Sequence, residues 1–410
     1  MHVIFDLDGT LFQTAICEYY AVNQLRSEYS LPSLSEQIIK QNIGKQTADF
    51  LKCYFPESYL SDTFIEHYHN LEHAAILQHG SLFPDIPALL EHLKRNHCQL
   101  DICSNGSVEY INRVLDKTNI RAYFRHLITA QNFSSKADAI RTLLTEESPA
   151  VIVGDTTSDF DAANKNFLPS IGAAYGYGND LSAATYRAET PLEIMDLVMQ
   201  CDLFYQITKK LFSCTIQTIG INGIDTSGKT VFSNHYSRFL SSRGIENTVL
   251  HMDDFHNPAA IRRHGKNEID AYYRHAFNYE TLVQQILLPL KREGILNKKL
   301  LCLNLDTDIY ENPLQYTVTQ KGILIIEGVL LFRPPLIRYL DKKIYLHISF
   351  EEMLKRAAER DVPKYGTAIL EKYQNKYIPI QKRYFEEFHP AQNADIVINN
   401  ENFRRPVILS

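Results

Sequence analysis

The chain has 410 residues, of which 45% are hydrophobic and 22% charged, and its formal net charge is −6. One hydrophobic core rarely serves so many residues, so the length predicts two domains, and the composition excludes a disordered or fibrous protein. The apolar runs are shorter than the roughly 20 residues of a membrane span, so we expect no membrane association.

Seven cysteines are scattered along the chain without a C-x-x-C pair. An odd, dispersed set favours free thiols in a cytoplasmic protein over a disulfide framework or a zinc site. The chain begins directly with a strand-like segment, so no cleaved signal peptide is expected.

Charge is divided unevenly between the two halves of the chain. Residues 1–205 hold 14 Lys and Arg against 26 Asp and Glu, whereas residues 206–410 hold 28 against 22. An acidic half beside a basic half suits a metal–carboxylate site joined to a site for a polyanionic nucleotide; a simple drift of surface charge is the alternative. No run of Lys and Arg is long enough to predict nucleic-acid binding.

Apolar runs alternate with helical patterns in the first half. The runs are HVIF (2–5), QLDIC (99–103), AVIVGD (150–155) and SIGAAYG (170–176), and the patterns include DIPALLEHLKRN (85–96) and SSKADAIRTLLTEE (134–147). Such alternation predicts an α/β domain with a doubly wound parallel sheet over residues 1–200. The segment from about 14 to 82 is rich in helix formers and aromatics and is predicted to be an inserted helical cap.

A second α/β series begins near residue 215. Its apolar runs are TIQTIGI (215–221), NTVLHMDDF (247–255), GILIIEGVLLF (322–332), DKKIYLHIS (341–349) and ADIVINN (394–400). They predict a second doubly wound parallel-sheet domain over residues 215–410. Residues 201–214 are too apolar for a flexible linker, and we expect an interdomain helix there.

Polar and charged residues follow the predicted strands of the first half. The acids are Asp6, Asp8, Asp155 and Asp159, and the hydrogen-bond donors are Ser104 and Lys136. Since parallel strands end at one edge of a sheet, the acids should converge there, and crowded carboxylates without paired bases predict Mg²⁺. A hydroxyl and an ammonium group are suited to holding a phosphoryl group. The alternative is that the acids are caps and turns and that Lys136 is a solvated helix residue.

These motifs, in this order, resemble the haloacid dehalogenase superfamily of phosphatases, with a cap like that of phosphoglycolate-type enzymes. The resemblance implies a phosphomonoesterase in which Asp6 attacks phosphorus to form an aspartyl-phosphate, while Asp8 protonates the leaving oxygen and then activates water. It also implies metal ligands and phosphoryl contacts. The implied Mg²⁺ ligands are Asp6, Asp155 and the main-chain carbonyl of Asp8, supported by Asp159, and the implied phosphoryl contacts are Ser104 and Lys136.

The stretch GIDTSGKT (223–230) satisfies GxxxxGK[ST] between a predicted strand and a predicted helix. Its backbone N–H groups would surround phosphates, Lys229 would reach the β- and γ-phosphates, and Thr230 would offer its hydroxyl to Mg²⁺. ATP is therefore the expected phosphate donor. The predicted nucleotide-binding residues are Gly223, Ile224, Asp225, Thr226, Ser227, Gly228, Lys229 and Thr230.

Acids and arginines follow this loop at later strand and helix positions. Asp253 in MDDF could accept a proton from an acceptor hydroxyl, and Glu327 could reach the metal or its water. Arg356 and Arg360, four residues apart, could close over the transferring phosphate or form surface ion pairs. This order resembles the uridine kinase and phosphoribulokinase group of P-loop kinases. The resemblance implies that Asp253 is the catalytic base and Glu327 the metal-side acid. It also implies that Arg356 and Arg360 are lid residues.

The expected acceptor pocket departs from that group. His256 stands where uridine kinases have a tyrosine, and FNYETL (277–282) replaces an Asp-His-Pro turn. Uridine is therefore not assigned as the acceptor. The candidate pocket residues are His256, Tyr272, Arg274 and Tyr279, with plain packing as the alternative.

Together the motifs predict a bifunctional enzyme, a Mg²⁺-dependent phosphatase joined to an ATP-dependent kinase for a hydroxyl of a small metabolite such as a nucleoside or sugar. A nucleic-acid end-healing phosphatase and 5′-kinase is one alternative, but a cap over the first site and the lack of a basic–aromatic stripe weigh against it. A nucleotide sensor with one inactive domain is another, but it would predict a missing catalytic residue, and none is missing.

Overall fold

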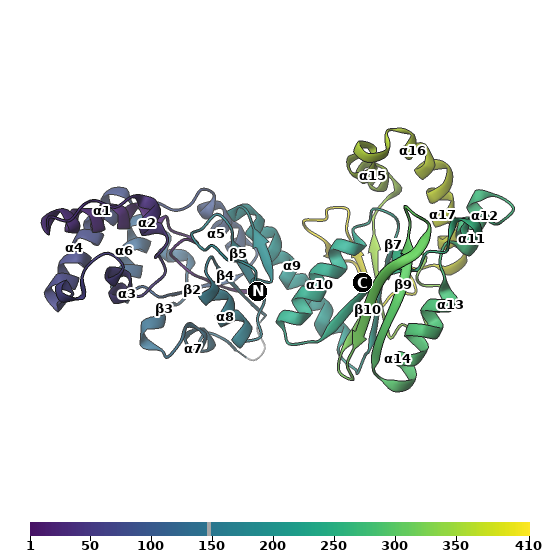
Figure 1. The fold of residues 1–410 in the computed structure, drawn as a ribbon, viewed down its shortest axis with the longest axis horizontal. Helices are drawn as coiled ribbons and strands as arrows, with labels where there is room; N and C mark the ends of the chain where they lie inside the picture. The colour runs from purple at the N-terminus through teal and green to yellow at the C-terminus, as the bar shows by residue number, and fades with distance from the viewer. Residues whose placement is uncertain (146–148) are drawn as a thin grey trace. The chain divides into compact units, whose positions relative to one another are not determined.

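The computed structural model describes residues 1–145 and 149–410 and divides into two compact units, Met1–Asp202 and Leu203–Ser410. Each unit is an α/β domain built on its own six-stranded sheet (Figure 1). Every strand pair of the first sheet is parallel, and in the second only the terminal pair is antiparallel. The predicted fold class of both halves is confirmed.

The first sheet has the strand order β3-β2-β1-β4-β5-β6. Its strands are β1 (His2–Phe5), β2 (Gln99–Ser104), β3 (Leu127–Thr129), β4 (Ala150–Gly154), β5 (Ser170–Ala173) and β6 (Tyr186–Ala188). All residues of β1, β4 and β5 are buried, as expected for parallel strands covered on both faces, so their sequences read as continuous apolar runs. The order places β1 between β2 and β4, so the loops after these three strands share one edge.

Helices of two kinds surround this sheet. The helices of the predicted cap segment are α1 (Thr14–Glu28), α2 (Glu36–Lys40), α3 (Thr47–Lys52) and α4 (Asp62–His79), and those that follow are α5 (Ile86–Arg95), α6 (Val108–Thr118), α7 (Lys136–Arg141), α8 (Thr157–Lys165) and α9 (Pro191–Leu211). Helices α1 to α4 gather beside the sheet, with α1 packed along α4 (Figure 1). The helical pattern over 134–147 yields only the short α7, and residues 146–147 lie outside the described residues.

The second sheet has the strand order β14-β13-β12-β7-β11-β8. Its strands are β7 (Thr218–Gly223), β8 (Asn247–His251), β11 (Ile323–Gly328), β12 (Lys342–His347), β13 (Ile396–Asn399) and β14 (Val407–Ile408). The central strands β7 and β11 are fully buried. Strand β7 therefore ends beside β11, and β11 ends beside β8.

The helices of the second unit are α10 (Lys229–Ser242), α11 (Ala259–Arg262), α12 (Glu268–His275), α13 (Tyr279–Leu282), α14 (Leu288–Glu293), α15 (Phe350–Tyr365), α16 (Ala368–Lys372) and α17 (Ile378–Phe388). An antiparallel hairpin of β9 (Leu296–Asn304) and β10 (Ile309–Val318), which the sequence did not predict, adds to this unit. Residues in its middle are exposed, so it lacks the long apolar runs of the central strands.

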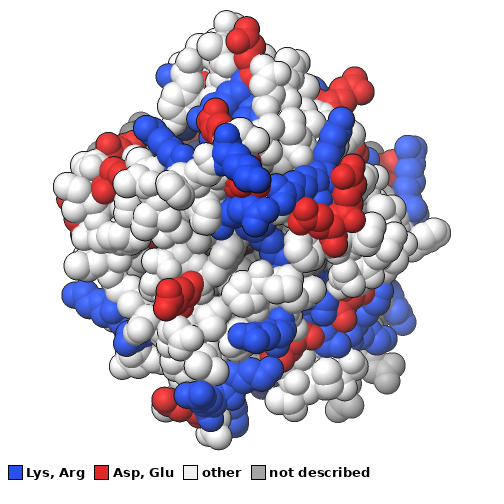
Figure 2. Space-filling view, turned by 90° about the vertical axis from the view of Figure 1, so that its right-hand side faces the viewer, with Lys and Arg blue, Asp and Glu red and all other residues white. Residues whose placement is uncertain are grey.

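Of the expected interdomain helix over residues 201–214, residues 201–211 lie in α9, whereas residues 212–214 lie beyond its end. The division between the units falls within α9. No helix among the described residues is long and apolar enough to cross a membrane. Figure 2 shows one face of the molecule on which Lys and Arg side chains cluster with Asp and Glu beside them. The ion pairs of the second unit include Arg383 with Asp270, so part of its basic charge is already balanced.

Candidate functional site

Three acids of the first unit converge at the carboxyl edge of the sheet. Asp6 follows β1, Asp155 follows β4, and Asp159 lies in the first turn of α8. Each offers a carboxylate oxygen within 4.8 Å of the other two, and all three side chains are buried. Among the described residues no other group of this kind could hold a metal ion. The tertiary fold thus brings together the acids that the sequence pattern placed at separate strand ends.

Lys136 lies between two of these acids. Its Nζ is 2.6 Å from Asp6 Oδ1 and 2.6 Å from Asp159 Oδ1, and its side chain is 5% exposed. Burial lowers the pKa of Lys136, but Asp159 and Asp6 outweigh burial and raise it overall, so the ammonium stays charged. The lysine is the first residue of α7, where the Ser135 hydroxyl accepts a hydrogen bond from the helix backbone.

Asp6 and Asp155 have raised pKa values, first because they are buried and then because neighbouring negative charges repel them. Burial raises the pKa of Asp6, Lys136 opposes the rise, and Asp159 and Asp155 add to it. Burial and Asp159 raise the pKa of Asp155 to about 7, although its Oδ2 accepts hydrogen bonds from the N–H groups of Tyr177 at 2.7 Å and Gly178 at 3.2 Å. One lysine therefore does not balance the cluster.

Gly9 makes the close packing of this edge feasible. Its φ is +74°, and a Cβ atom there would lie 2.2 Å from Asp155 Oδ2. Any other residue would strain the backbone and displace the carboxylate, so the DGT turn needs glycine.

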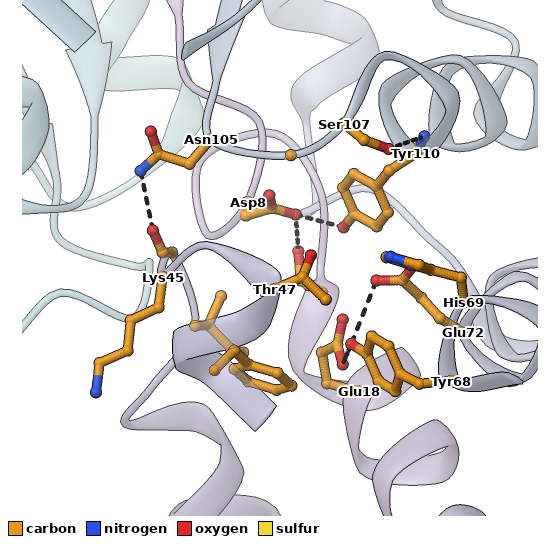
Figure 3. A pocket seen from close by; sticks show the side chains of 15 residues that line it. Asp8, Glu18, Lys45, Thr47, Tyr68, His69, Glu72, Asn105, Ser107 and Tyr110 are labelled. Atoms are coloured by element: carbon orange, nitrogen blue, oxygen red, sulfur yellow. Dashed lines mark hydrogen bonds and ion pairs between the residues drawn. The ribbon is translucent and has the colours of Figure 1, made fainter. Parts of the chain in front are cut away.

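Asp8 is held by groups that the sequence did not single out. Its Oδ1 accepts a hydrogen bond from the Tyr110 hydroxyl at 2.5 Å (Figure 3). It also accepts one from the Thr14 hydroxyl at 2.6 Å. Burial raises the pKa of Asp8, while Thr14, Tyr110 and the predicted Ser104 lower it. Ser104 ends β2 and is fully buried, with its Oγ accepting the N–H of Gly106 at 3.0 Å. Tyr110 comes from α6, and no local motif announces its contact with Asp8.

The predicted nucleotide loop joins β7 to α10. Thr226 and Gly228 have φ values of +56° and +86°, which turn the backbone so that α10 starts at Lys229. The Lys229 ammonium curls back to the Ile224 carbonyl at 2.8 Å and is buried. The loop therefore presents the start of a helix of 14 residues, whose free N–H groups and dipole favour an anion.

Glu327 connects this loop to strand β8. Its Oε1 accepts the Thr230 hydroxyl at 2.9 Å and contacts His251 Nδ1 at 2.7 Å. His251 and Glu327 are register partners on parallel β8 and β11. Burial raises the pKa of Glu327, but His251 and Lys229 outweigh it and lower the pKa overall. His251 was missed from the sequence, where only its place at a strand end beside MDDF distinguishes it.

The two predicted lid arginines have different surroundings. Arg356 donates hydrogen bonds to the carbonyls of Thr226 at 3.3 Å, Asn400 at 2.6 Å and Glu401 at 3.0 Å, so it lies against the nucleotide loop. Arg360 instead bonds Asp361 at 2.8 Å and the Tyr373 hydroxyl. The four-residue spacing therefore does not give them the same role in this structure.

Among the candidate acceptor residues, His256 lies beside Asp253, whose side chain is 74% exposed. His256 Nε2 lies 3.7 Å from Asp253 Oδ1, and its Nδ1 donates to the Ala276 carbonyl at 3.0 Å. The His256 ring stacks on the Phe277 ring, with the ring centroids 4.5 Å apart. The centroid of the Tyr272 ring lies 6.3 Å from that of His256.

Tyr279 and Arg274 complete the predicted pocket set. The ring centroid of Tyr279 lies 6.0 Å from that of Phe277, so Tyr279 belongs to the same aromatic cluster. Arg274 pairs with Asp270 at 2.8 Å and is 57% exposed, so its guanidinium is engaged on the surface of α12. The structure thus groups His256, Tyr272 and Tyr279 but gives Arg274 a partner of its own.

Two families match this chain. Residues 3–173 match the haloacid dehalogenase-like hydrolases, and residues 218–403 match the phosphoribulokinase/uridine kinase family. Among similar curated proteins, the phosphoglycolate phosphatase of Aquifex aeolicus (strain VF5) is 29% identical over 188 residues, which are 43% of this chain and 85% of the relative. The phosphoglycolate phosphatase of Caulobacter vibrioides is 23% identical over 236 residues, which are 53% of this chain and 95% of the relative.

Solved structures resemble either unit. A haloacid dehalogenase-like hydrolase from Streptococcus pneumoniae is 23% identical, with a TM-score of 0.44 and coverage of 48% of this chain and 97% of its own. A possible uridine kinase from Bacillus stearothermophilus is 27% identical, with a TM-score of 0.38 and the same two coverages. Both predicted family resemblances are confirmed by the family matches: the first unit belongs to the haloacid dehalogenase-like hydrolases, and the second belongs to the phosphoribulokinase/uridine kinase family.

Proposed function

We propose that the chain is a bifunctional enzyme in which a Mg²⁺-dependent phosphomonoesterase is joined to an ATP-dependent kinase of small hydroxyl-bearing metabolites. The observation that carries the first half is Lys136, buried between Asp6 and Asp159 beside Asp155. A nucleophile, a fixed cation and further carboxylates at one sheet edge are the groups that phosphoryl transfer through an aspartate requires.

The carboxylate cluster fits a divalent cation. Three carboxylates and one ammonium leave two negative charges when all are ionised, and burial together with this excess raises the pKa values of Asp6 and Asp155. Asp6, Asp155 and the main-chain carbonyl of Asp8 would hold Mg²⁺, with Asp159 in support, because oxygen ligands suit this ion. When bound, Mg²⁺ would neutralise this excess and the charge of the phosphoryl oxygens.

Each side chain of the site then has its own role in the reaction. The Asp6 carboxylate attacks phosphorus, the bond from phosphorus to the ester oxygen breaks, and Asp8 gives its proton to that oxygen. Water next attacks the aspartyl-phosphate, Asp8 takes a proton from the water, and the bond between phosphorus and Asp6 breaks to release phosphate. Tyr110 and Thr14 hold Asp8 in place, while Lys136 and Ser104 hold the phosphoryl oxygens.

In the second unit, the loop before α10 would hold the phosphates of ATP. Lys229 would leave the Ile224 carbonyl to contact the β- and γ-phosphates, and Thr230 and Glu327 would hold Mg²⁺. Asp253 would accept the proton of the acceptor hydroxyl as its oxygen attacks the γ-phosphorus and the bond to ADP breaks. The aromatic cluster of His256, Tyr272 and Phe277 supports an acceptor with a ring, such as a nucleoside or sugar.

Two variants test the proposal in the full chain. Asp6→Asn should abolish phosphate release from monoesters and leave ATP-dependent transfer intact, whereas Lys229→Ala should do the reverse. Assays would use panels of phosphate esters and of hydroxyl acceptors, with a 5′-hydroxyl oligonucleotide among the acceptors. The proposal fails if the wild-type chain shows neither activity or if each variant keeps the activity it should lose; phosphorylation of the oligonucleotide alone would favour end healing.

A further inference from the structure

A cavity lies beside Asp8 in the first unit. It is lined from α1, α3, α4 and α6 as well as by the loops around Asp8 and Asn105 (Figure 3). Tyr110 borders this cavity and donates its hydroxyl to Asp8 Oδ1 at 2.5 Å. Since Asp8 is the group that protonates the leaving oxygen in the proposed phosphatase, the cavity beside it is where the alcohol portion of a substrate has room.

Two buried glutamates face this cavity from helices that pack together. Glu18 of α1 is 5% exposed and Glu72 of α4 is 6% exposed. The Tyr68 hydroxyl lies 2.5 Å from Glu18 Oε2 and 3.3 Å from Glu72 Oε1. A phenol has only one proton to donate, so it satisfies one of the two carboxyl groups, and Glu18 and Glu72 also hydrogen-bond each other. Burial raises the pKa of Glu18 and raises that of Glu72 to about 7.

Little positive charge in the protein offsets the two glutamates. Among the described residues, the only ion pair to either one is His69 Nδ1 with Glu72 Oε2 at 3.1 Å, and burial lowers the pKa of His69. Lys45 lines the cavity, but its ammonium points away from the glutamates in Figure 3 and bonds Asn42 Oδ1 at 2.7 Å. The glutamates also lie outside the group of acids whose oxygens could hold a metal ion.

We propose that this cavity selects phosphate monoesters whose alcohol portion carries a protonated amine, with the ammonium group held between Glu18 and Glu72. The inference rests on the proposed phosphatase function and names its substrate class. An ammonium group would supply three donors and a positive charge to two carboxyl groups that otherwise share the Tyr68 proton and hydrogen-bond each other. The rings of Tyr68, Tyr110 and Phe50 line the same space and favour a cation. A substrate carboxylate would instead meet two buried acids, so the site is unsuited to the glycolate group named in the relatives' activity.

The test uses the full chain and alkyl phosphates of graded length that end in an ammonium, a hydroxyl or a carboxylate group. At neutral pH with Mg²⁺, kcat/KM for the best ammonium ester should exceed that of the carboxylate ester of equal length by about tenfold or more, which corresponds to about 1.4 kcal/mol. Glu18→Gln and Glu72→Gln should remove this preference while hydrolysis of the hydroxyl esters stays within about threefold.

Glu28→Gln is the matched control. Glu28 is also on α1 but is 39% exposed and pairs with His67, so its loss should leave the preference unchanged. If a glutamine variant fails to fold, competition by ammonium and carboxylate alkyl phosphonates against the wild-type chain measures the same preference by affinity.

The outcomes separate the two proposals. Equal hydrolysis and equal competition by all end groups, or a preference for carboxylate, overturns the inference and leaves the phosphatase function standing. Absence of hydrolysis of every ester, p-nitrophenyl phosphate included, defeats the phosphatase function itself. An ammonium preference that survives both glutamine variants overturns the assignment to Glu18 and Glu72.

Discussion

The ammonium group of Lys136 lies 2.6 Å from the carboxylate of Asp6, and both side chains are buried. The same ammonium also contacts Asp159, so the nucleophile is tied to the capped start of α8 through a single lysine. Among the described residues no other cation is ion-paired to these acids or to Asp155. The position of Asp6 and the charge balance of the site therefore depend on one side chain.

Lys136→Met keeps much of the side-chain length but removes the charge. Phosphatase kcat should fall by about 10²–10³-fold because a fixed donor to the phosphoryl oxygens is lost. The free energy of unfolding of the first unit should fall by about 3–5 kcal/mol in a chelator, because buried carboxylates lose their partner. Initial rates and urea unfolding measure these effects. Lys165→Met, at an exposed site of α8, is the control, and equal behaviour of the two variants would contradict the prediction.

The raised pKa of Asp155 leads to a prediction of how the free energy of unfolding depends on pH in the absence of a metal ion. Its pKa is raised to about 7, whereas an aspartate of the unfolded chain titrates near ~3.9. Between these values the native state binds more protons, so the free energy of unfolding should fall as pH rises, by up to about 1.4 kcal/mol per unit, and level off above 7. Urea unfolding in a chelator from pH 4 to pH 8 would show this. Asp155→Asn should flatten the slope and Mg²⁺ should restore stability above pH 7; an unchanged slope in the variant would refute the assignment.

His251→Ala tests the orientation of Glu327. The histidine bonds the same Glu327 oxygen that accepts the Thr230 hydroxyl, so its loss should free the carboxylate to rotate. The Mg²⁺ concentration for half-maximal kinase rate should rise by about 10–100-fold, the usual effect of removing a partner of a metal ligand. Kinase assays across a Mg²⁺ series measure the shift, with phosphate release by the first unit unaffected. His264→Ala, an exposed histidine of the same unit, should cause no shift.

The roles of Arg356 and Arg360 can be distinguished by measuring the affinity of variants for ADP, which lacks the transferring phosphate. Arg356 holds carbonyls of the nucleotide loop and of the chain after β13, so Arg356→Ala should weaken ADP binding by about tenfold or more. Arg360→Ala removes contacts with Asp361 and Tyr373 and should leave ADP affinity within about threefold of wild type. Calorimetric titration with ADP decides the matter: if Arg356→Ala binds ADP normally while transfer is slow, Arg356 acts on the transferring phosphate instead.

Much of the fold was predictable because its central strands are buried on both faces. Strands β1, β2 and β4 lie where the apolar runs predicted them, since such runs need no partner information to be recognised. The β9–β10 hairpin was missed because its residues are largely half-buried or exposed and its apolar run, residues 300–303, is short. The division between the units falls inside helix α9, within the segment 201–214 that was expected to be an interdomain helix.

The candidate sites were predictable where the chemistry follows a strand end within a few residues. FDLDGT and GIDTSGKT hold their key residues in one local segment, so spacing alone places Asp6 and Asp8 on one turn and Lys229 at the start of a helix. Contacts across the fold were not predictable. Tyr110 reaches Asp8 from 102 residues away, and His251 meets Glu327 from 76 residues away, through parallel strand register.

Residue type and local spacing were enough to predict two α/β units, two phosphate-handling motifs and the identity of the acids. Which of the charges are balanced became visible only in the folded chain. Lys136 contacts two acids, and Arg356 and Arg360 have different partners. Glu18 and Glu72 come together from two helices beside Asp8. The physical reason is that a charge acquires its role from its burial and from its nearest partners, and these partners come together only when distant segments pack.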